Sequence, residues 1–243
     1  MLNSKCLHIG EVYGTNNYGD IIIIEYNSYS DVLVRFIGTG FETKTNMSNI
    51  RKGNVKDRLS PSVYDVGIVG AAPTKQNGKT LLEYKIWKGV MQRCYSQSHK
   101  KLNPSYLNCR ASESFKNFTF FSEWATKQIG FGSKFDIDKD ILGCGSVYSE
   151  DVCVFVPREV NLVFTNRVKM AKGACFDERL GKFAAQICDG GGNRRLGLFY
   201  NEAEAELAYL KEKTKRIEFL AEKYKHYIDY RVYVKLLQLT KEI

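Results

Sequence analysis

The sequence predicts a modular α+β protein, and three stretches of the chain carry this prediction. Short β-rich runs alternate with turn residues from Ile9 to Ile50. A strand, a turn, a second strand and a helix follow one another between residues 135 and 169, and three strand-like segments precede a helix after residue 173. We expect an N-terminal β-module over 1–70, a strand–turn–strand–helix core over 71–169, a three-stranded sheet with its helix over 170–214, and a C-terminal helical extension over 215–243.

The composition indicates a folded protein with polyanionic partners. Hydrophobic residues make up 44% of the chain and aromatic residues 13%, which is typical of globular domains rather than disordered segments. The chain carries 36 Lys and Arg against 27 Asp and Glu, a formal charge of +9. Residues 1–70 hold seven basic and seven acidic side chains, so the surplus lies after residue 70. Such a surplus favours phosphate-rich partners.

The cysteines and the hydropathy predict a cytosolic protein without a membrane span. Seven cysteines form no CxxC pair, and an odd number of this kind fits reduced thiols. Because there is no close pair, we expect small buried hydrophobic side chains and no structural zinc at Cys94, Cys109, Cys144 and Cys153. The longest aliphatic run, Ile21–Ile24, is far shorter than the roughly 20 residues that a bilayer requires.

The N-terminal module is predicted to be a small sheet. The runs IIIIEY and VLVRFI have strand composition and are separated by the turn NSYSD. The following stretch, from Gly53 to Thr80, looks like an irregular connection. It ends in NGKT, but Pro73 stands where a phosphate-binding loop needs glycine, so NGKT predicts a turn. The module has no catalytic signature; it could pack on the core, touch DNA or bind a protein partner.

Aromatic residues are predicted to build the core of the next region. Leu81 to Tyr95 places Tyr84, Trp87 and Met91 at helical spacing, which indicates a buried helix. A second segment repeats phenylalanine every three residues beside Trp124, and its three rings should pack in the interior. These rings are Phe115, Phe118 and Phe121.

A strand–turn–strand–helix unit follows. FDIDKDIL and VCVFV have strand patterns on either side of a turn at GCGS, and Pro157 suits the first position of a helix. The aspartates of FDIDKDIL do not form a calcium loop, because Ile141 and Val147 occupy the glycine and glutamate positions. One face of the helix is apolar, and its polar face carries Arg158, Asn161, Thr165 and Lys169.

The blocks YKIWKGVMQRCY, FKNFTFFSEW and FDIDKDILGCGSVYSEDVCVFVPREVN together resemble phage HNH homing endonucleases over about a third of the chain. This resemblance implies a ββα-metal fold that hydrolyses DNA with Mg²⁺ or Mn²⁺. It implies that Asp138 and Asn161 bind the metal, with Asp136 or Asp140 in support. Arg158 and Lys169, which share the polar helix face, are then expected to contact DNA.

The sequence departs from the HNH pattern at one catalytic position. Where these enzymes carry the histidine that activates water, this chain has Lys139. A lysine near its reference pKa of about 10.4 would need a downshift of about three units, roughly 4 kcal/mol, to act as a base at neutral pH. Three interpretations remain: an unusual base, a cation that steadies the phosphorane, or the mark of an inactive nuclease.

The segment from Gly173 to Lys213 resembles the ethylene-response-factor (AP2) type of DNA-binding domain found in plant regulators and phage nucleases. The resemblance is best at KFAAQI, RRLGLF and EAELAYLKEK. It implies a three-stranded sheet that enters the major groove of double-stranded DNA. Strand alternation places Lys182, Ala184 and Gln186 on one face. The matched DNA-binding positions are Arg179, Lys182, Gln186, Arg194 and Arg195.

Together these features predict a phage-type site-directed DNA endonuclease that works in the cytoplasm of an infected bacterium. A first alternative is a catalytically degenerate DNA-binding protein, a repressor or decoy, that kept the scaffold and lost the base. A second is a protein-interaction module that inhibits a host factor, for which the basic surface would be incidental.

Overall fold

The computed structural model describes residues 8–143, 145–164, 173–188 and 192–242. The fold is mixed α+β, as predicted, with 37% helix, 26% strand and several small sheets. The chain forms two compact units, which we describe separately. The first comprises Met1–Lys100 and Lys116–Ser122, and the second comprises Lys101–Phe115 and Glu123–Ile243.

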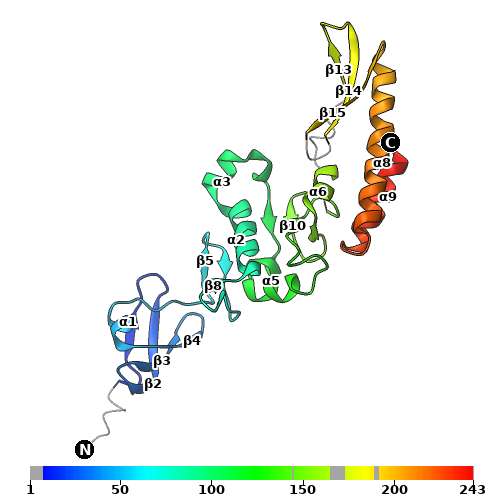
Figure 1. Cartoon of the computed structure of the whole chain (residues 1–243). Helices are drawn as coiled ribbons and strands as arrows, with labels where there is room; N and C mark the ends of the chain where they lie inside the picture. The colour runs from blue at the N-terminus through cyan, green and yellow to red at the C-terminus, as the bar shows by residue number, and fades with distance from the viewer. Residues whose placement is uncertain (1–7, 144, 165–172, 189–191, 243) are drawn as a thin grey trace, which may run out of the picture. The chain divides into compact units, whose positions relative to one another are not determined.

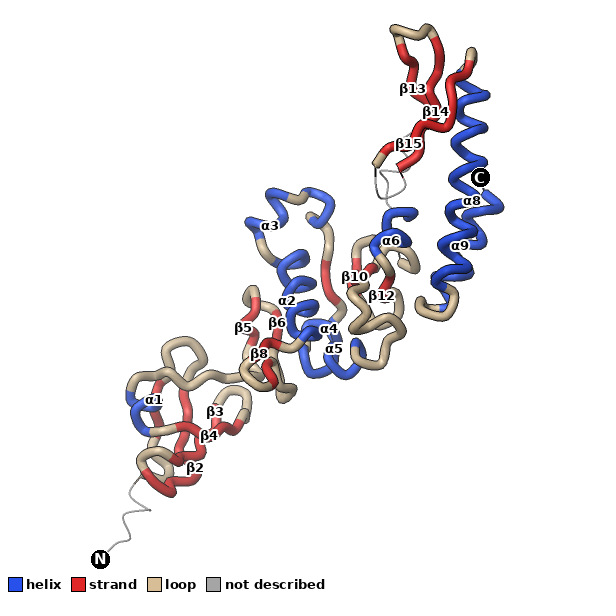
Figure 2. The backbone as a smooth tube through the Cα atoms, in the orientation of Figure 1, coloured by secondary structure: helices blue, strands red, loops and turns tan. Residues whose placement is uncertain are grey.

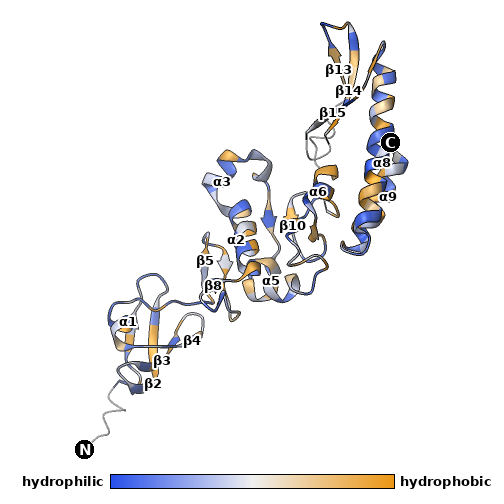
Figure 3. Cartoon of the chain, in the orientation of Figure 1, coloured by the Kyte–Doolittle hydropathy of each residue, from blue (hydrophilic) through white to orange (hydrophobic). Residues whose placement is uncertain are grey.

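The first unit begins with the predicted β-sheet. Its four antiparallel strands follow chain order: β1 (Val12–Gly14), β2 (Asp20–Ser28), β3 (Asp31–Phe36) and β4 (Glu42–Thr45). The aliphatic residues of β2 and β3 stand out in Figure 3, and alternate ones are fully buried. Together with helix α1 (Met47–Arg51), they enclose a core of Ile21, Ile23, Val32, Val34, Phe36, Met47, Ile50 and Val55.

The stretch predicted to be irregular contains two short hairpins. These are β5 (Pro61–Val63) with β6 (Gly67–Ile68), and β7 (Lys75–Gln76) with β8 (Lys79–Thr80). Asn77 and Gly78 form the two-residue turn of the second hairpin, both at positive φ (50° and 74°), which is the geometry that Asn-Gly favours. The turn at NGKT is confirmed.

The aromatic core is also confirmed. Helix α2 (Leu82–Tyr95) buries Trp87, Val90, Met91 and Cys94, and α3 (Gln97–Leu102) follows it. In the first unit, the ring of Phe118 lies 5.3 Å from that of Trp87, centroid to centroid. In the second unit, the ring centroids of Phe115 and Trp124 lie 4.7 Å apart. Phe115, Phe118 and Phe121 come from α4 (Glu113–Lys116) and α5 (Phe118–Ala125), and all three are fully buried.

The second unit contains the predicted strand, strand and helix. Strand β10 (Asp136–Asp138) pairs antiparallel with β12 (Val154–Val156), and α6 (Arg158–Phe164) begins directly after Pro157. The connection between the strands is longer than a turn. It carries β11 (Val147–Tyr148), which pairs in parallel with β9 (Arg110–Ala111); a short 3₁₀ helix, η2 (Pro104–Tyr106), precedes β9. Residues 165–172, where the predicted helix would continue, lie outside the described residues.

The three predicted strands and the helix after them are confirmed. β13 (Ala174–Asp177), β14 (Lys182–Cys188) and β15 (Asn193–Phe199) form an antiparallel sheet in that order. Helix α8 (Glu202–Tyr224) begins where the Asn201 side chain accepts the amide of Glu204 at 2.8 Å, a standard N-cap. It is continuous through residue 214, where the sequence predicts a boundary. The break comes later, before α9 (Tyr230–Glu242).

Helix α8 packs on two structures. Its first half, with Ala205 and Tyr209 buried, runs beside all three strands of the sheet (Figures 1 and 2). Its second half places Ile217 and Leu220 in one core with β12, α6 and α9. This core also contains Val154, Val156, Val160, Ala221, Val232 and Leu236. We call β10, β12, the loop between them and α6 the strand–loop–strand–helix region. This region and the three-stranded sheet both pack on α8, so they are connected by a shared helix as well as by the chain after α6.

Candidate functional site

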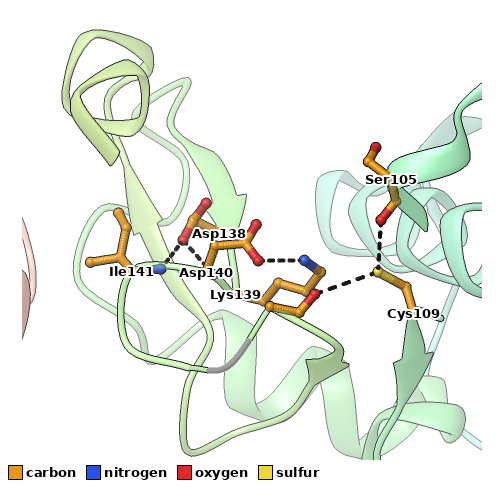
Figure 4. A network of polar contacts seen from close by, with 7 residues as sticks. Ser105, Cys109, Asp138, Lys139, Asp140 and Ile141 are labelled. Atoms are coloured by element: carbon orange, nitrogen blue, oxygen red, sulfur yellow. Dashed lines mark hydrogen bonds and ion pairs between the residues drawn. The ribbon is translucent and has the colours of Figure 1, made fainter. Parts of the chain in front are cut away.

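Asp138 closes the turn at the end of β10. Asp138 is 6% exposed, and its Oδ1 accepts hydrogen bonds from the backbone amides of Asp140 and Ile141, each at 2.8 Å (Figure 4). Burial raises the pKa of the Asp138 carboxyl, and the two amide hydrogen bonds work against that rise. The carboxylate predicted to bind metal therefore also holds the local backbone, and the described residues provide no hydrogen-bond donor to its Oδ2.

Lys139 is buried in an ion pair with its neighbour. It is 4% exposed, and its Nζ lies 2.6 Å from Oδ1 of Asp140 (Figure 4) and 5.4 Å from the ring centre of Tyr148. Burial lowers the pKa of Lys139, but the hydrogen bond and charge of Asp140 outweigh it, so the pKa lies above the ordinary lysine value. At neutral pH this ammonium has no lone pair to accept a proton, which argues against the base interpretation.

The other predicted metal ligands are Asn161 on α6 and Asp140 just after β10. Asn161 is half-buried on α6, and among the described residues no hydrogen bond links it to Asp138. The carboxylate of Asp140 is taken by Lys139. Over the described ranges, outside which Cys144 lies, no three His, Cys, Asp or Glu side chains lie close enough together to hold a metal ion. The donor set thus fits a divalent cation only in part.

Two further predicted contacts lie on or beyond α6. Arg158 is exposed at the start of the helix, and Lys169 lies outside the described residues. Next to Arg158, the carboxylate of Glu159 accepts hydrogen bonds from the Tyr224 hydroxyl and from Lys223 Nζ, the latter at 2.6 Å. These bonds tie α6 to α8, so Arg158 projects from a fixed helix.

The three-stranded sheet presents one face to solvent. Directly opposed residues of antiparallel strands share a face, and Gln186 pairs with Arg195 while Ala184 pairs with Leu198 and Cys175. The register skips Leu196, a β-bulge that keeps Arg195 and Leu198 on the same side. We call this side the open face; it consists of Cys175, Asp177, Lys182, Ala184, Gln186, Arg195 and Leu198.

The opposite side of the sheet is covered by α8. Ala185 and Ile187 lie on it and are 0% and 6% exposed. The alternation predicted for β14 is therefore confirmed, with Lys182, Ala184 and Gln186 on the open face.

A depression of about 660 Å³ lies on the open face. Arg179 reaches it from the turn between β13 and β14, and Arg195, with 52% of its side chain exposed, reaches it from β15. At one end of the face, Lys182 Nζ lies 4.4 Å from the ring centre of Tyr200, which is 80% exposed. The full lining is Cys175, Phe176, Asp177, Glu178, Arg179, Leu180, Ala184, Gln186 and Arg195.

Arg194 does not share the open face with Arg195. It pairs with Ile187 in the sheet, and its Nη2 lies 2.6 Å from Oε1 of Glu212 on α8. Consecutive strand residues point to opposite sides, so the predicted contacts at Arg194 and Arg195 lie on different faces of the sheet. The alternation rule already applied to β14 would have separated them.

Two residues that the structure brings to this surface were missed from the sequence. Asp177 ends β13 on the open face, and Tyr200 follows β15 and stacks on Lys182. For Tyr200 a signal existed, because it stands two positions after Leu198 and so continues the same face. For Asp177 the only signal was an acidic residue at the strand end before a turn.

Comparison with protein-family models, with curated proteins and with solved structures finds no significant match to this chain. Throughout the part of the chain that the structure describes, no helix combines the length and the apolar character needed to cross a membrane.

Proposed function

We propose that this chain binds double-stranded DNA through the open face of its three-stranded sheet. The observation that carries the proposal is the separation of the two faces, with Lys182, Gln186 and Arg195 on the open side and α8 packed on the other. Arg179 extends the same surface from the turn. A twisted sheet of this kind fits the major groove, where lysine neutralises phosphates and glutamine and arginine bond base edges.

Binding in this mode must depend on salt. Each phosphate neutralised by a basic side chain releases counterions, so the logarithm of the association constant falls with the logarithm of salt concentration, by about 0.9 per phosphate. We expect the full chain to shift a duplex in a gel at about 50 mM salt and to lose affinity steadily up to about 200 mM. Absence of binding at physiological salt would instead favour a protein-interaction module.

A second candidate activity is hydrolysis of a phosphodiester at the strand–loop–strand–helix region, with DNA as substrate. It is favoured by the position of Asp138 at the end of β10, which pairs with β12, the strand that leads into α6. Only Oδ1 of Asp138 accepts hydrogen bonds from the two backbone amides, so Oδ2 remains for a metal ion. Asp138 and Asn161 would hold Mg²⁺ or Mn²⁺, which would polarise the phosphate and supply a bound water. Because Lys139 is held as an ammonium by Asp140, the chain has no base there and cleavage by the parent is slow or absent.

A further inference from the structure

We infer that Asp177 is a positioning residue that directs Arg195 to the major-groove edge of guanine, while Gln186 reads the neighbouring base pair. The inference rests on the proposed DNA binding and deepens it by assigning what the open face recognises. It concerns a residue that is acidic and would, by charge alone, weaken binding to a polyanion.

The two carboxylate oxygens of Asp177 contact different groups, the backbone of the turn and the side chain of Arg195. Its Oδ1 accepts hydrogen bonds from the backbone amides of Arg179 and Leu180, at 3.2 Å and 3.3 Å. The turn therefore fixes the orientation of the carboxylate. Its Oδ2 lies 4.0 Å from Nη2 of Arg195. One side chain, only 27% exposed, thus accepts hydrogen bonds within the turn that carries Arg179 and forms an ion pair with the guanidinium of Arg195.

The guanidinium of Arg195 extends along the open face toward Asp177. In the register, Arg195 stands opposite Gln186 and Asp177 stands opposite Lys182, with Ala184 midway between them on β14. Ala184 belongs to the open face but is only 3% exposed, and it lines the same depression as Arg195 and Asp177. The small side chain leaves room for the arginine to extend over the sheet toward the carboxylate.

An arginine held this way suits a base edge better than a phosphate. The carboxylate restricts the rotamers of the guanidinium and repels phosphate oxygens, yet leaves the planar fork of donors available. Guanine offers two acceptors, O6 and N7, at the spacing of that fork. Gln186 lies directly across from Arg195 and can bond N6 and N7 of adenine in the next base pair. The expected ligand is therefore a duplex with adjacent guanine and adenine.

The test uses the full chain and a randomised duplex library. From this library the parent should select a preferred site containing guanine. In Asp177→Ala we expect two opposite changes: tighter binding to unrelated duplex, because a negative charge is lost, and a preference for guanine over the other bases that falls about tenfold. Asp177→Asn keeps an oxygen to accept the turn amides while removing the charge, and should show the same loss of preference with an unchanged melting temperature.

Glu178→Ala is the matched control. Glu178 is exposed and lines the same depression, but no ion pair joins it to Arg195 among the described residues. It should bind unrelated duplex more tightly and keep the guanine preference. If the two alanine variants change preference equally, or neither does, Asp177 acts only through its charge and the inference is overturned. A parent that binds no duplex overturns the proposed function itself.

Discussion

Replacing Lys182 and Arg195 together with alanine is expected to lower the affinity for duplex DNA by about 2–4 kcal/mol, which is roughly 30-fold or more. In the proposed binding mode Lys182 would supply a phosphate contact, and Arg195 would supply a base contact worth about 1–3 kcal/mol. Both lie on the open face, away from the core that α8 covers, so the fold should survive. The measurement is a gel-shift or anisotropy titration at several salt concentrations, in which the salt slope should also become shallower.

The control removes equal charge elsewhere. Lys211 on α8 and Lys235 on α9 are both exposed and lie outside the three-stranded sheet. The Lys211→Ala, Lys235→Ala double variant should lose much less affinity than the open-face variant. Equal losses would mean that net charge, not the open face, binds the DNA. Truncation before the sheet is a poor alternative, because it also removes Ile217 and Leu220 from the core that supports α6.

The second large effect concerns Lys139. Lys139→His is expected to raise metal-dependent nicking of supercoiled plasmid by about 10²–10⁴-fold, the usual contribution of a positioned general base. The reason is that histidine, with an unperturbed pKa of about 6.5, can take a proton from water at neutral pH, whereas the ammonium of Lys139 cannot. The substitution also frees the carboxylate of Asp140, which Lys139 now holds at 2.6 Å.

Two controls separate this nicking from contamination. Chelation with EDTA should abolish it, and adding Asp138→Asn to Lys139→His should reduce it strongly, because one metal ligand loses its charge. The asparagine side chain keeps an oxygen for the amides of Asp140 and Ile141, so the turn at the end of β10 should persist. A folded Lys139→His variant that leaves plasmid intact with Mg²⁺ and with Mn²⁺ would show that the region lacks more than a base, and DNA binding would stand alone.

The local structure of this chain could be predicted where periodicity determines it. Short β-rich runs separated by turn residues predicted β2 and β3, and the spacing of Trp87 and Met91 predicted α2. The three strands before α8 followed from strand-like runs separated by turn residues. Each of these elements buries one face, so its apolar residues recur along the sequence with the period of the strand or helix.

Features that depend on contacts between distant segments could not be predicted. The packing of α8 on both the sheet and α6 brings together segments that no local pattern connects. The ion pair between Lys139 and Asp140 depends on how β10 and the following loop bury the lysine. The alignment of Asp177 with Arg195 depends on strand register and on the bulge at Leu196. The sequence therefore identified candidate residues better than it identified their partners.

Cys175 reports directly on whether duplex DNA lies on the open face, as we propose. Its side chain is exposed and lines the depression, whereas Cys94, Cys109 and Cys153 are buried. The measurement is the rate of alkylation of Cys175 by iodoacetamide, followed by peptide mass spectrometry, with and without duplex at low salt. Bound duplex is expected to slow alkylation of Cys175 severalfold. An unchanged rate, under conditions where a gel shift shows binding, would place the DNA elsewhere and contradict binding on the open face.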